Sequence, residues 1–271
     1  MANLISIQEA VDNFKALIEN SISEGGITAK EAMIRSSRPI KYIHEAVKSA
    51  LITSGIELHR IFPPLGASSP EMKLAGFLKH KHQDVCVAPN GHIPANEIMQ
   101  EGLLQEAADF YGKAYTEKIL AINIRSQMSS LAKNFDTLYE RTIAEAQNLH
   151  VRCPKMVLGE VYMIAVKEYN PVAMKNKQVA YIDRVGAVEK YIRSFQAING
   201  RIDFTKEDYK YERVCLLIVD FGKSPAKIYN TNQELIADGL MSPHSKSNIG
   251  ELNWDSFTPS IHKTYESRFG K

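Results

Sequence analysis

The sequence lacks a strong excess of charge of either sign. Its 33 lysines and arginines stand against 31 aspartates and glutamates, which leaves a formal net charge of +2. A protein that binds nucleic acid through its overall charge, as a histone does, is therefore excluded. Any charge that binds DNA must be local.

Cysteine is also scarce. The chain contains three, Cys86, Cys153 and Cys215, which lie far apart, form no CxxC pair and are flanked by apolar or strand-like sequence. This pattern predicts buried, reduced thiols in a cytosolic protein and argues against a disulfide framework.

Long apolar runs and common catalytic motifs are absent. No stretch approaches the roughly 20 apolar residues needed to cross a bilayer, and residues 1–7 lack a signal-peptide pattern. We therefore expect a soluble, cytoplasmic protein. The absence of GxxxxGK[ST], GxGxxG after a strand, GxSxG and HExxH argues against P-loop, Rossmann, α/β-hydrolase and zinc-protease chemistry. His80, His82 and His92 lie near Cys86, but their spacing matches no common zinc-ligand pattern.

The N-terminal region, residues 1–68, is predicted to be helical. Ser6 and Glu9 have the spacing of a capping box, and apolar residues follow on one helical face. Two adjacent glycines are expected to end this first helix, and further helices are predicted over residues 28–36 and 39–53.

Residues 69–229 alternate between helical and strand patterns, which predicts an α/β core with helices on the faces of its sheet. The directions of the strands stay open. The expected elements are helices over 70–77, 96–111, 135–149 and 188–198, and strands over 84–89, 118–126, 156–166, 213–220 and 226–229.

Residues 230–271 lack sustained periodicity and are predicted to be loop-rich. They are expected either to fold onto the core or to form an arm that contacts DNA. Lys246, Asn248, Asn253 and Lys263 carry donor and acceptor groups of the kind that read base edges. The three regions together are expected to form one compact domain.

Polar residues mark two of the predicted strands. Asp84 begins one, and Asn123 and Arg125 share a face of another because side chains alternate along a strand. In a metal-dependent nuclease, acidic or amide oxygens on neighbouring strands hold Mg²⁺ against the scissile phosphate, and a nearby cation stabilises the phosphorane. The alternative is that Asn123 and Arg125 lie on the solvated face of a half-buried strand.

The order Asp84, Asn123-x-Arg125, helix, strand resembles the core of type II restriction endonucleases of the PD-(D/E)XK nuclease superfamily. In that superfamily an aspartate on one strand is followed by (Asp/Glu)-x-Lys on the next, then by a helix and a strand. Here Asn stands for the acidic residue, as in some family members, and Arg stands for lysine. Because arginine does not lose its proton, Arg125 can stabilise charge but cannot serve as a base. The resemblance covers roughly residues 70–225, with an insertion between Asp84 and Asn123.

This resemblance implies a restriction-endonuclease-like mixed sheet and Mg²⁺-dependent hydrolysis of double-stranded DNA at a specific short sequence. Asp84 and Asn123 would hold the metal, with Glu71 as an additional ligand. Arg125 would stabilise the phosphorane, and Gln127 would contact a metal-bound water or a phosphate. Glu71 is equally typical of a solvated helix, and Gln127 of a turn.

The resemblance also implies partners. A homodimer would present two active sites to the two strands of a palindrome, and a cognate DNA methyltransferase would protect host DNA without binding this chain. Surface solvation is the alternative for the basic residues among the expected DNA contacts. Those contacts are Lys79, Lys81, Ser126, Ser129, Ser130, Lys133 and Arg141.

Glu160 interrupts an otherwise apolar strand, and a lone carboxylate there needs a partner. We expect it to pair with Arg141 or Lys133, with a metal-ligand role as the alternative. Two other functions stay open for the chain: a non-catalytic DNA-binding protein with a nuclease-like fold, and an α/β scaffold with no role in nucleic-acid binding. A fold without basic side chains beside Asp84 would count against both DNA hypotheses.

Overall fold

A mixed six-stranded sheet forms the centre of the computed structural model, which describes residues 3–129, 131–183 and 187–270. The strands lie in the order β1 (Ile61–Phe62), β4 (Val85–Val87), β7 (Leu120–Gln127), β8 (Val157–Ala165), β11 (Arg213–Asp220) and β12 (Lys227–Tyr229). The three central strands, β7, β8 and β11, are parallel, and the outer strands are antiparallel to their neighbours. All nine residues of β8 are buried, as expected for a strand covered on both faces. The expected α/β sheet with helices on its faces is confirmed, and its strand directions are mixed.

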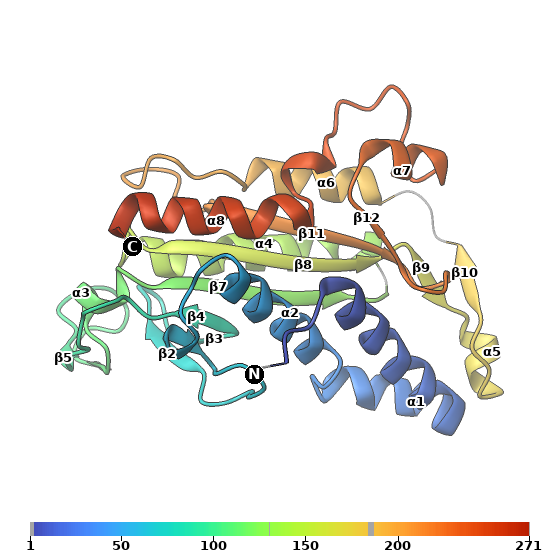
Figure 1. Cartoon of the computed structure of the whole chain (residues 1–271), viewed down its shortest axis with the longest axis horizontal. Coiled ribbons are helices and arrows are strands. Elements are labelled where there is room, and N and C mark those ends of the chain that lie inside the picture. The colour runs from blue at the N-terminus through green and yellow to red at the C-terminus, as the bar shows by residue number, and fades with distance from the viewer. Residues whose placement is uncertain (1–2, 130, 184–186, 271) are drawn as a thin grey trace.

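Helices cover both faces of the sheet (Figure 1). On one face, α1 (Ile7–Arg35), α2 (Ile40–Thr53) and α8 (Trp254–Phe269) pack against alternate strand residues such as Ile122 and Val161. On the other, α4 (Leu131–His150) and α6 (Val188–Ala197) pack against the intervening residues, including Ala121 and Leu158. None of the helices in the described ranges is both long and apolar enough to span a membrane.

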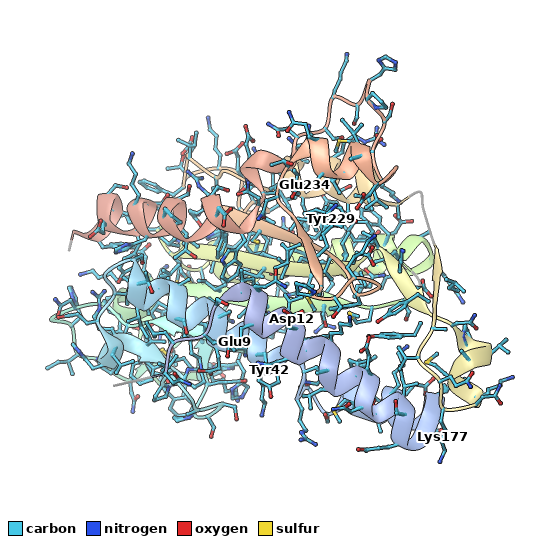
Figure 2. The ribbon with its side chains drawn as sticks, turned by 45° about the vertical axis from the view of Figure 1, so that its right-hand side comes forward. Glu9, Asp12, Tyr42, Lys177, Tyr229 and Glu234 are labelled. Atoms are coloured by element: carbon cyan, nitrogen blue, oxygen red, sulfur yellow. The ribbon has the colours of Figure 1, made fainter. Side chains whose placement is uncertain are left out.

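The N-terminal helices match the sequence prediction closely. Ser6 accepts a hydrogen bond from the backbone N–H of Glu9 at 3.1 Å, which begins α1. The predicted break appears as a kink inside α1, where Gly26 has φ 65° and ψ −144°. Asp12 ties α1 to the segment before β12, because its Oδ1 accepts from the backbone N–H of Ala226 at 2.8 Å (Figure 2).

Two predicted helices in the core were wrong. Residues 70–77 contain β2 (Met72–Ala75), which pairs antiparallel with β3 (His80–Gln83). Residues 96–111 contain β5 (Glu97–Ile98) and β6 (Ala108–Asp109), which pair as a second small ribbon. Neither segment is long enough for sequence periodicity to separate strand from helix, so local apolar content misled the prediction.

Short elements fill the connections of the core. The 3₁₀ turn η1 (Leu58–Arg60) precedes β1, and α3 (Lys113–Thr116) precedes β7. Between β8 and α6, β9 (Lys167–Tyr169) pairs antiparallel with β10 (Tyr181–Asp183), and α5 (Pro171–Lys175) lies between them in the chain.

The C-terminal segment is more ordered than its sequence predicted. It contains α7 (Asn232–Ala237), η2 (Ile249–Glu251) and α8, whose Phe257, Ile261 and Tyr265 are buried against the sheet. Two residues expected to read bases have other partners: Asn248 and Asn253 cap η2 and α8. The prediction of a loop-rich segment was therefore wrong, because spaced apolar residues and N-caps outweigh its Gly, Pro and Ser content. Of the two expected placements, α8 follows the first, since it folds onto the core.

Candidate active site

Asp84 lies directly before β4, at the point where β4 pairs antiparallel with β7. Its Oδ2 accepts a hydrogen bond from the backbone N–H of Ile124 at 2.7 Å, which fixes the carboxylate beside the Asn123-x-Arg125 segment. The side chain is half-buried and lines a cavity of about 380 Å³. Within the described ranges, Asp84 makes no ion pair.

Asn123 and Arg125 point from β7 toward α4, so the hypothesis of a solvated strand face was wrong. Asn123 is 1% exposed, and its Oδ1 accepts from the Lys81 ammonium at 3.1 Å. Arg125 donates from Nη1 to the Thr142 hydroxyl at 2.9 Å and forms an ion pair with Glu145 through Nη2. These contacts hold the guanidinium rigidly against α4.

Glu145 of α4 is the residue that sequence analysis missed. Its carboxylate meets three cations: Arg125, the Lys81 ammonium at 2.5 Å and Arg141 Nε at 3.3 Å. The side chain is only 3% exposed. A signal was present in the sequence, because Glu145 stands between Leu138 and Leu149 on the buried stripe of an amphipathic helix.

Glu160 of β8 is fully buried, and its carboxylate meets the Tyr211 hydroxyl and the Arg125 guanidinium. Its nearest cation is Arg125, whose Nε lies 3.5 Å from Oε1, so the expected pairing with Arg141 or Lys133 was wrong. Burial raises the pKa of Glu160, and the nearby Arg125 and Lys81 offset part of that rise. Burial, together with the charge of Arg125, lowers the pKa of Lys81.

The cavity beside Asp84 lies among several elements. The end of α1 and the start of α2 contribute Ile34, Ser37 and Ile40, while β7 and α4 contribute the polar side of the wall. Its charged lining consists of Lys81, Asp84, Arg125, Arg141 and Glu145. The basic side chains expected beside Asp84 under both DNA hypotheses are therefore present.

Three predicted site residues, Asn123, Glu71 and Gln127, lie outside the lining of this cavity. Glu71 directly precedes β2 and is not on a helix; its carboxylate is 3.8 Å from His82. Burial and the charge of Asp84 raise the pKa of Glu71, so the two carboxylates interact. Gln127 is buried, and its Oε1 accepts from the hydroxyls of Tyr191 at 2.5 Å and Tyr162 at 3.1 Å.

The expected DNA contacts divide into three groups. Lys81 and Ser126 line the cavity, as does Arg141, whose side chain is 66% exposed. Lys79, Ser129 and Lys133 are exposed but do not line it. Ser130 lies outside the described residues.

In the described ranges, no three or more His, Cys, Asp or Glu side chains are grouped so that they could hold a metal ion. Comparison of the chain with protein-family models, curated proteins and solved structures gives no match.

Proposed function

We propose that this protein is a Mg²⁺-dependent endonuclease that hydrolyses phosphodiester bonds of double-stranded DNA at a specific short sequence. The observation that carries the proposal is the cavity in which the Asp84 carboxylate stands beside Lys81, Arg125 and Arg141. Cationic side chains of this kind contact DNA phosphates, and a carboxylate among them offers a place for a metal ion.

The path of the chain supports the same proposal. Antiparallel β4 and β7, then α4, then β8 parallel to β7, follow the order of elements in the PD-(D/E)XK superfamily that the sequence resembles. This path brings Asp84 and Arg125 into one cavity although 40 residues separate Asp84 from the β7 residue that binds it, Ile124. The restriction-endonuclease-like fold is part of the proposal.

The oxygen donors fit Mg²⁺, which usually takes one or two protein carboxylates and keeps several waters. Asp84 makes no ion pair within the described residues, and the hydrogen bond from Ile124 uses only its Oδ2, so this carboxylate has unused acceptor capacity. Asp84 would hold the ion, with Glu71 close to it, and the amide oxygen of Asn123 would join them by giving up its hydrogen bond from Lys81. The bound ion would supply Lewis acidity at the scissile phosphate.

Arg125 contributes charge that is fixed in place before substrate binds. Glu145, Glu160 and Thr142 surround its guanidinium, so little reorganisation is needed when negative charge develops on the phosphate. Glu145 also orders Lys81 and Arg141, which places three cations around one carboxylate. We assign Glu145 as a positioning residue for the phosphate-binding cations.

The proposed DNA cleavage also implies a quaternary structure, a functional partner and a cellular location for the protein. A homodimer would address both strands of a palindromic site, and a DNA methyltransferase would protect the host genome. Cytoplasmic location accords with both roles.

A non-catalytic DNA-binding protein is the second candidate. The observation that favours it is the charge compensation of the site, in which Lys81 and Arg125 already neutralise Glu145 and Arg125 lies beside Glu160. Such a protein would bind DNA through the same cations without cleaving it.

Cleavage of unmethylated phage DNA with Mg²⁺ separates the two candidates. We expect discrete fragments from the wild type and at least a hundredfold slower cleavage from Asp84→Ala, on the scale set by loss of one electrostatic contributor. Asp136→Ala is the matched control, because Asp136 is an exposed carboxylate on α4 that pairs with Lys190. Salt-sensitive DNA binding without cleavage in the wild type would favour the second candidate. If the wild type neither binds nor cleaves DNA, both candidate functions are contradicted.

A further inference from the structure

A second cationic cavity lies at the far end of β7 from the candidate active site. It has a volume of about 240 Å³ and is lined by Arg60, His92, Lys118 and Arg268 together with uncharged residues. No aspartate or glutamate of the described chain lines it. The two cavities share no lining residue. Lys118 and Arg125 are seven positions apart, about 23 Å along an extended strand.

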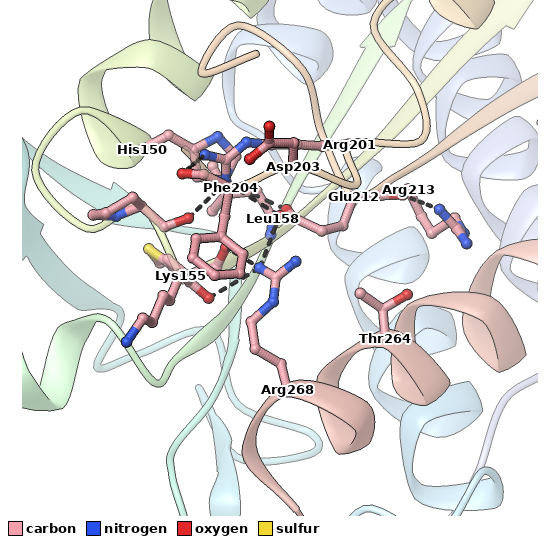
Figure 3. A network of polar contacts seen from close by, with 12 residues as sticks. His150, Lys155, Leu158, Arg201, Asp203, Phe204, Glu212, Arg213, Thr264 and Arg268 are labelled. Atoms are coloured by element: carbon pink, nitrogen blue, oxygen red, sulfur yellow. Dashed lines mark hydrogen bonds and ion pairs between the residues drawn. The ribbon is translucent and has the colours of Figure 1, made fainter. Parts of the chain in front are cut away.

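The cavity is assembled from four separate segments. Arg60 ends η1, His92 follows the turn after β4, Lys118 precedes β7, and Arg268 lies in the last turn of α8. The C-terminal end of α8 is marked in Figure 1, and Figure 3 shows Arg268 beside Phe204 and Lys155. Folding therefore brings these basic side chains together from distant parts of the chain.

Arg60 is a buried cation that pairs with no carboxylate of the described residues. It is 8% exposed, and it donates to the backbone oxygen of Ala88 at 2.9 Å and to the Tyr265 hydroxyl at 3.1 Å. Its Nη1 group makes no hydrogen bond to the described residues. A buried charge without a counter-ion is unfavourable, so an anion in the cavity would stabilise this arrangement.

Lys118 likewise pairs with no Asp or Glu in the part of the chain that the structure describes, and it contacts His92 instead. His92 Nδ1 lies 2.7 Å from the backbone oxygen of Asn90, which can only accept, so this nitrogen carries the proton. The neutral ring then offers Nε2 as an acceptor to the Lys118 ammonium. Two further N–H groups of Lys118 stay available to a ligand.

Two features reduce the positive electrostatic potential of this cavity. Arg268 is balanced by Glu212, whose Oε1 lies 2.9 Å from Nη1, and the C-terminus of α8 adds about half a negative charge. Arg60 and Lys118 supply two full positive charges, which exceed that half charge. A neighbouring cavity of about 400 Å³ shares Arg60, Asn90, Tyr265 and Gly270 with it. Glu57 and Glu266 line this neighbouring cavity and could accept hydrogen bonds from hydroxyl groups.

We propose that the cavity formed by Arg60, His92, Lys118 and Arg268 binds a phosphate group, separately from the candidate active site. Its volume equals that of several water molecules at about 30 Å³ each, which is enough for a tetrahedral oxyanion. Arginine and lysine N–H groups are the usual donors to phosphate oxygens. The phosphate belongs either to a mononucleotide or to the backbone of DNA.

Phosphate binding is tested by calorimetry with inorganic phosphate at constant ionic strength. We expect saturable binding to the wild type and at least tenfold weaker binding to the double variant His92→Gln/Lys118→Gln. Lys118→Arg should retain binding. Lys113→Gln is the matched control, because Lys113 is a nearby lysine already paired with Glu101 at 2.7 Å. Equal thermal stability of all variants in chloride would exclude a folding defect.

The source of the phosphate is identified with two further probes. If a mononucleotide is the ligand, it binds more tightly than inorganic phosphate, and the double variant leaves the salt dependence of DNA binding unchanged. If the DNA backbone is the ligand, Lys118→Gln lowers the slope of log affinity against log salt by about one. Absence of phosphate binding beyond a chloride control, or equal binding by the double variant, would overturn the proposal. Neither result depends on DNA cleavage, so the proposed endonuclease activity is tested separately.

Discussion

Two buried carboxylates have contrasting environments: Glu160 lies in β8, and Glu212 directly precedes the neighbouring strand β11. Around Glu212, Arg268 and Arg201 approach Oε1 at 2.9 and 3.3 Å, and the backbone N–H of Leu158 donates to Oε2 at 2.7 Å (Figure 3). Glu160 has fewer partners, the Tyr211 hydroxyl and Arg125 Nε, which lies 3.5 Å from Oε1. Removing a buried carboxylate that is shared by two cations is strongly destabilising, whereas a carboxylate with fewer partners can accept another group.

The protonation behaviour of the two residues differs in the same way. Burial alone would raise the pKa of Glu212, but hydrogen bonding and charge from His150, with further charge from Arg268, hold it below its ordinary value. Burial raises the pKa of Glu160, and its neighbours compensate only in part. Glu212 is therefore stable as an anion, and Glu160 resists ionisation.

The largest effect is expected from Glu212→Ala. This change leaves Arg201 and Arg268 without their shared carboxylate, and removal of one partner from a buried ion pair costs about 3–5 kcal/mol. Denaturant unfolding measures the loss, with the exposed Glu140→Ala on α4 as the control. A change below about 1 kcal/mol would show that Glu212 does not stabilise the fold as its contacts indicate.

A smaller loss is expected from Gly159→Ala, which tests the packing of α8 on β8. The added methyl would lie 2.6 Å from Ile261 Cδ1 and 3.0 Å from Phe257 Cζ. Overpacking of this kind destabilises a protein by about 1–3 kcal/mol.

The double variant Gly159→Ala/Ile261→Val removes the closest contact atom and serves as the control for overpacking. It should be less destabilised than the sum of the two single changes. If the losses of unfolding free energy from the two single changes simply add in the double variant, the added methyl group does not contact α8.

Sequence periodicity predicts the long buried strands well, and it fails for short paired strands and for α8. Long apolar strands such as β8 and β11 were predicted to within about a residue because burial on both faces leaves a continuous apolar run. Residues 72–75 and 97–109 contain strands of only two to four residues, each paired with a strand shortly before or after it in the chain, and strands this short carry too little periodicity to be recognised. The helix α8 was missed because Pro259 lies inside it.

The candidate site was predicted from sequence in part. Asp84 and Arg125 were found because polar residues on apolar strands are conspicuous, and both line the cavity. Glu145 was missed because it comes from α4, and spacing within a strand carries no information about which helix covers it. Gln127 shares a strand face with Arg125, yet Tyr162 and Tyr191 surround its amide oxygen at the helix-covered end of that face.

Gln127→Leu distinguishes a structural role of this residue from the catalytic role expected from sequence. Two tyrosine hydroxyls would lose an acceptor, at about 1 kcal/mol for each hydrogen bond. The Tyr191 hydroxyl can also donate to the backbone oxygen of Leu131 at 3.0 Å, which limits the loss of unfolding free energy. We expect a lower free energy of unfolding in denaturant and unchanged DNA cleavage below the unfolding transition. A hundredfold slower reaction of the folded variant would instead support the catalytic role.

The smallest effect at neutral pH is expected from Glu160→Gln. Glutamine keeps an oxygen that can accept from the Tyr211 hydroxyl, and Arg125 retains Glu145 and Thr142, so the stability should change by less than about 1 kcal/mol. The pH dependence is more informative, because a raised folded-state pKa means that the native protein holds its proton more tightly than the unfolded chain. The wild type should therefore lose stability relative to Glu160→Gln as pH rises above about 4.3, the ordinary glutamate pKa, and through the raised value.

For Glu212 the sign is opposite, since its lowered pKa gives a stabilisation that is lost on acidification. Unfolding free energies of wild type, Glu160→Gln and Glu212→Gln across this range measure both trends, and parallel curves for the two variants would remove the distinction between these carboxylates.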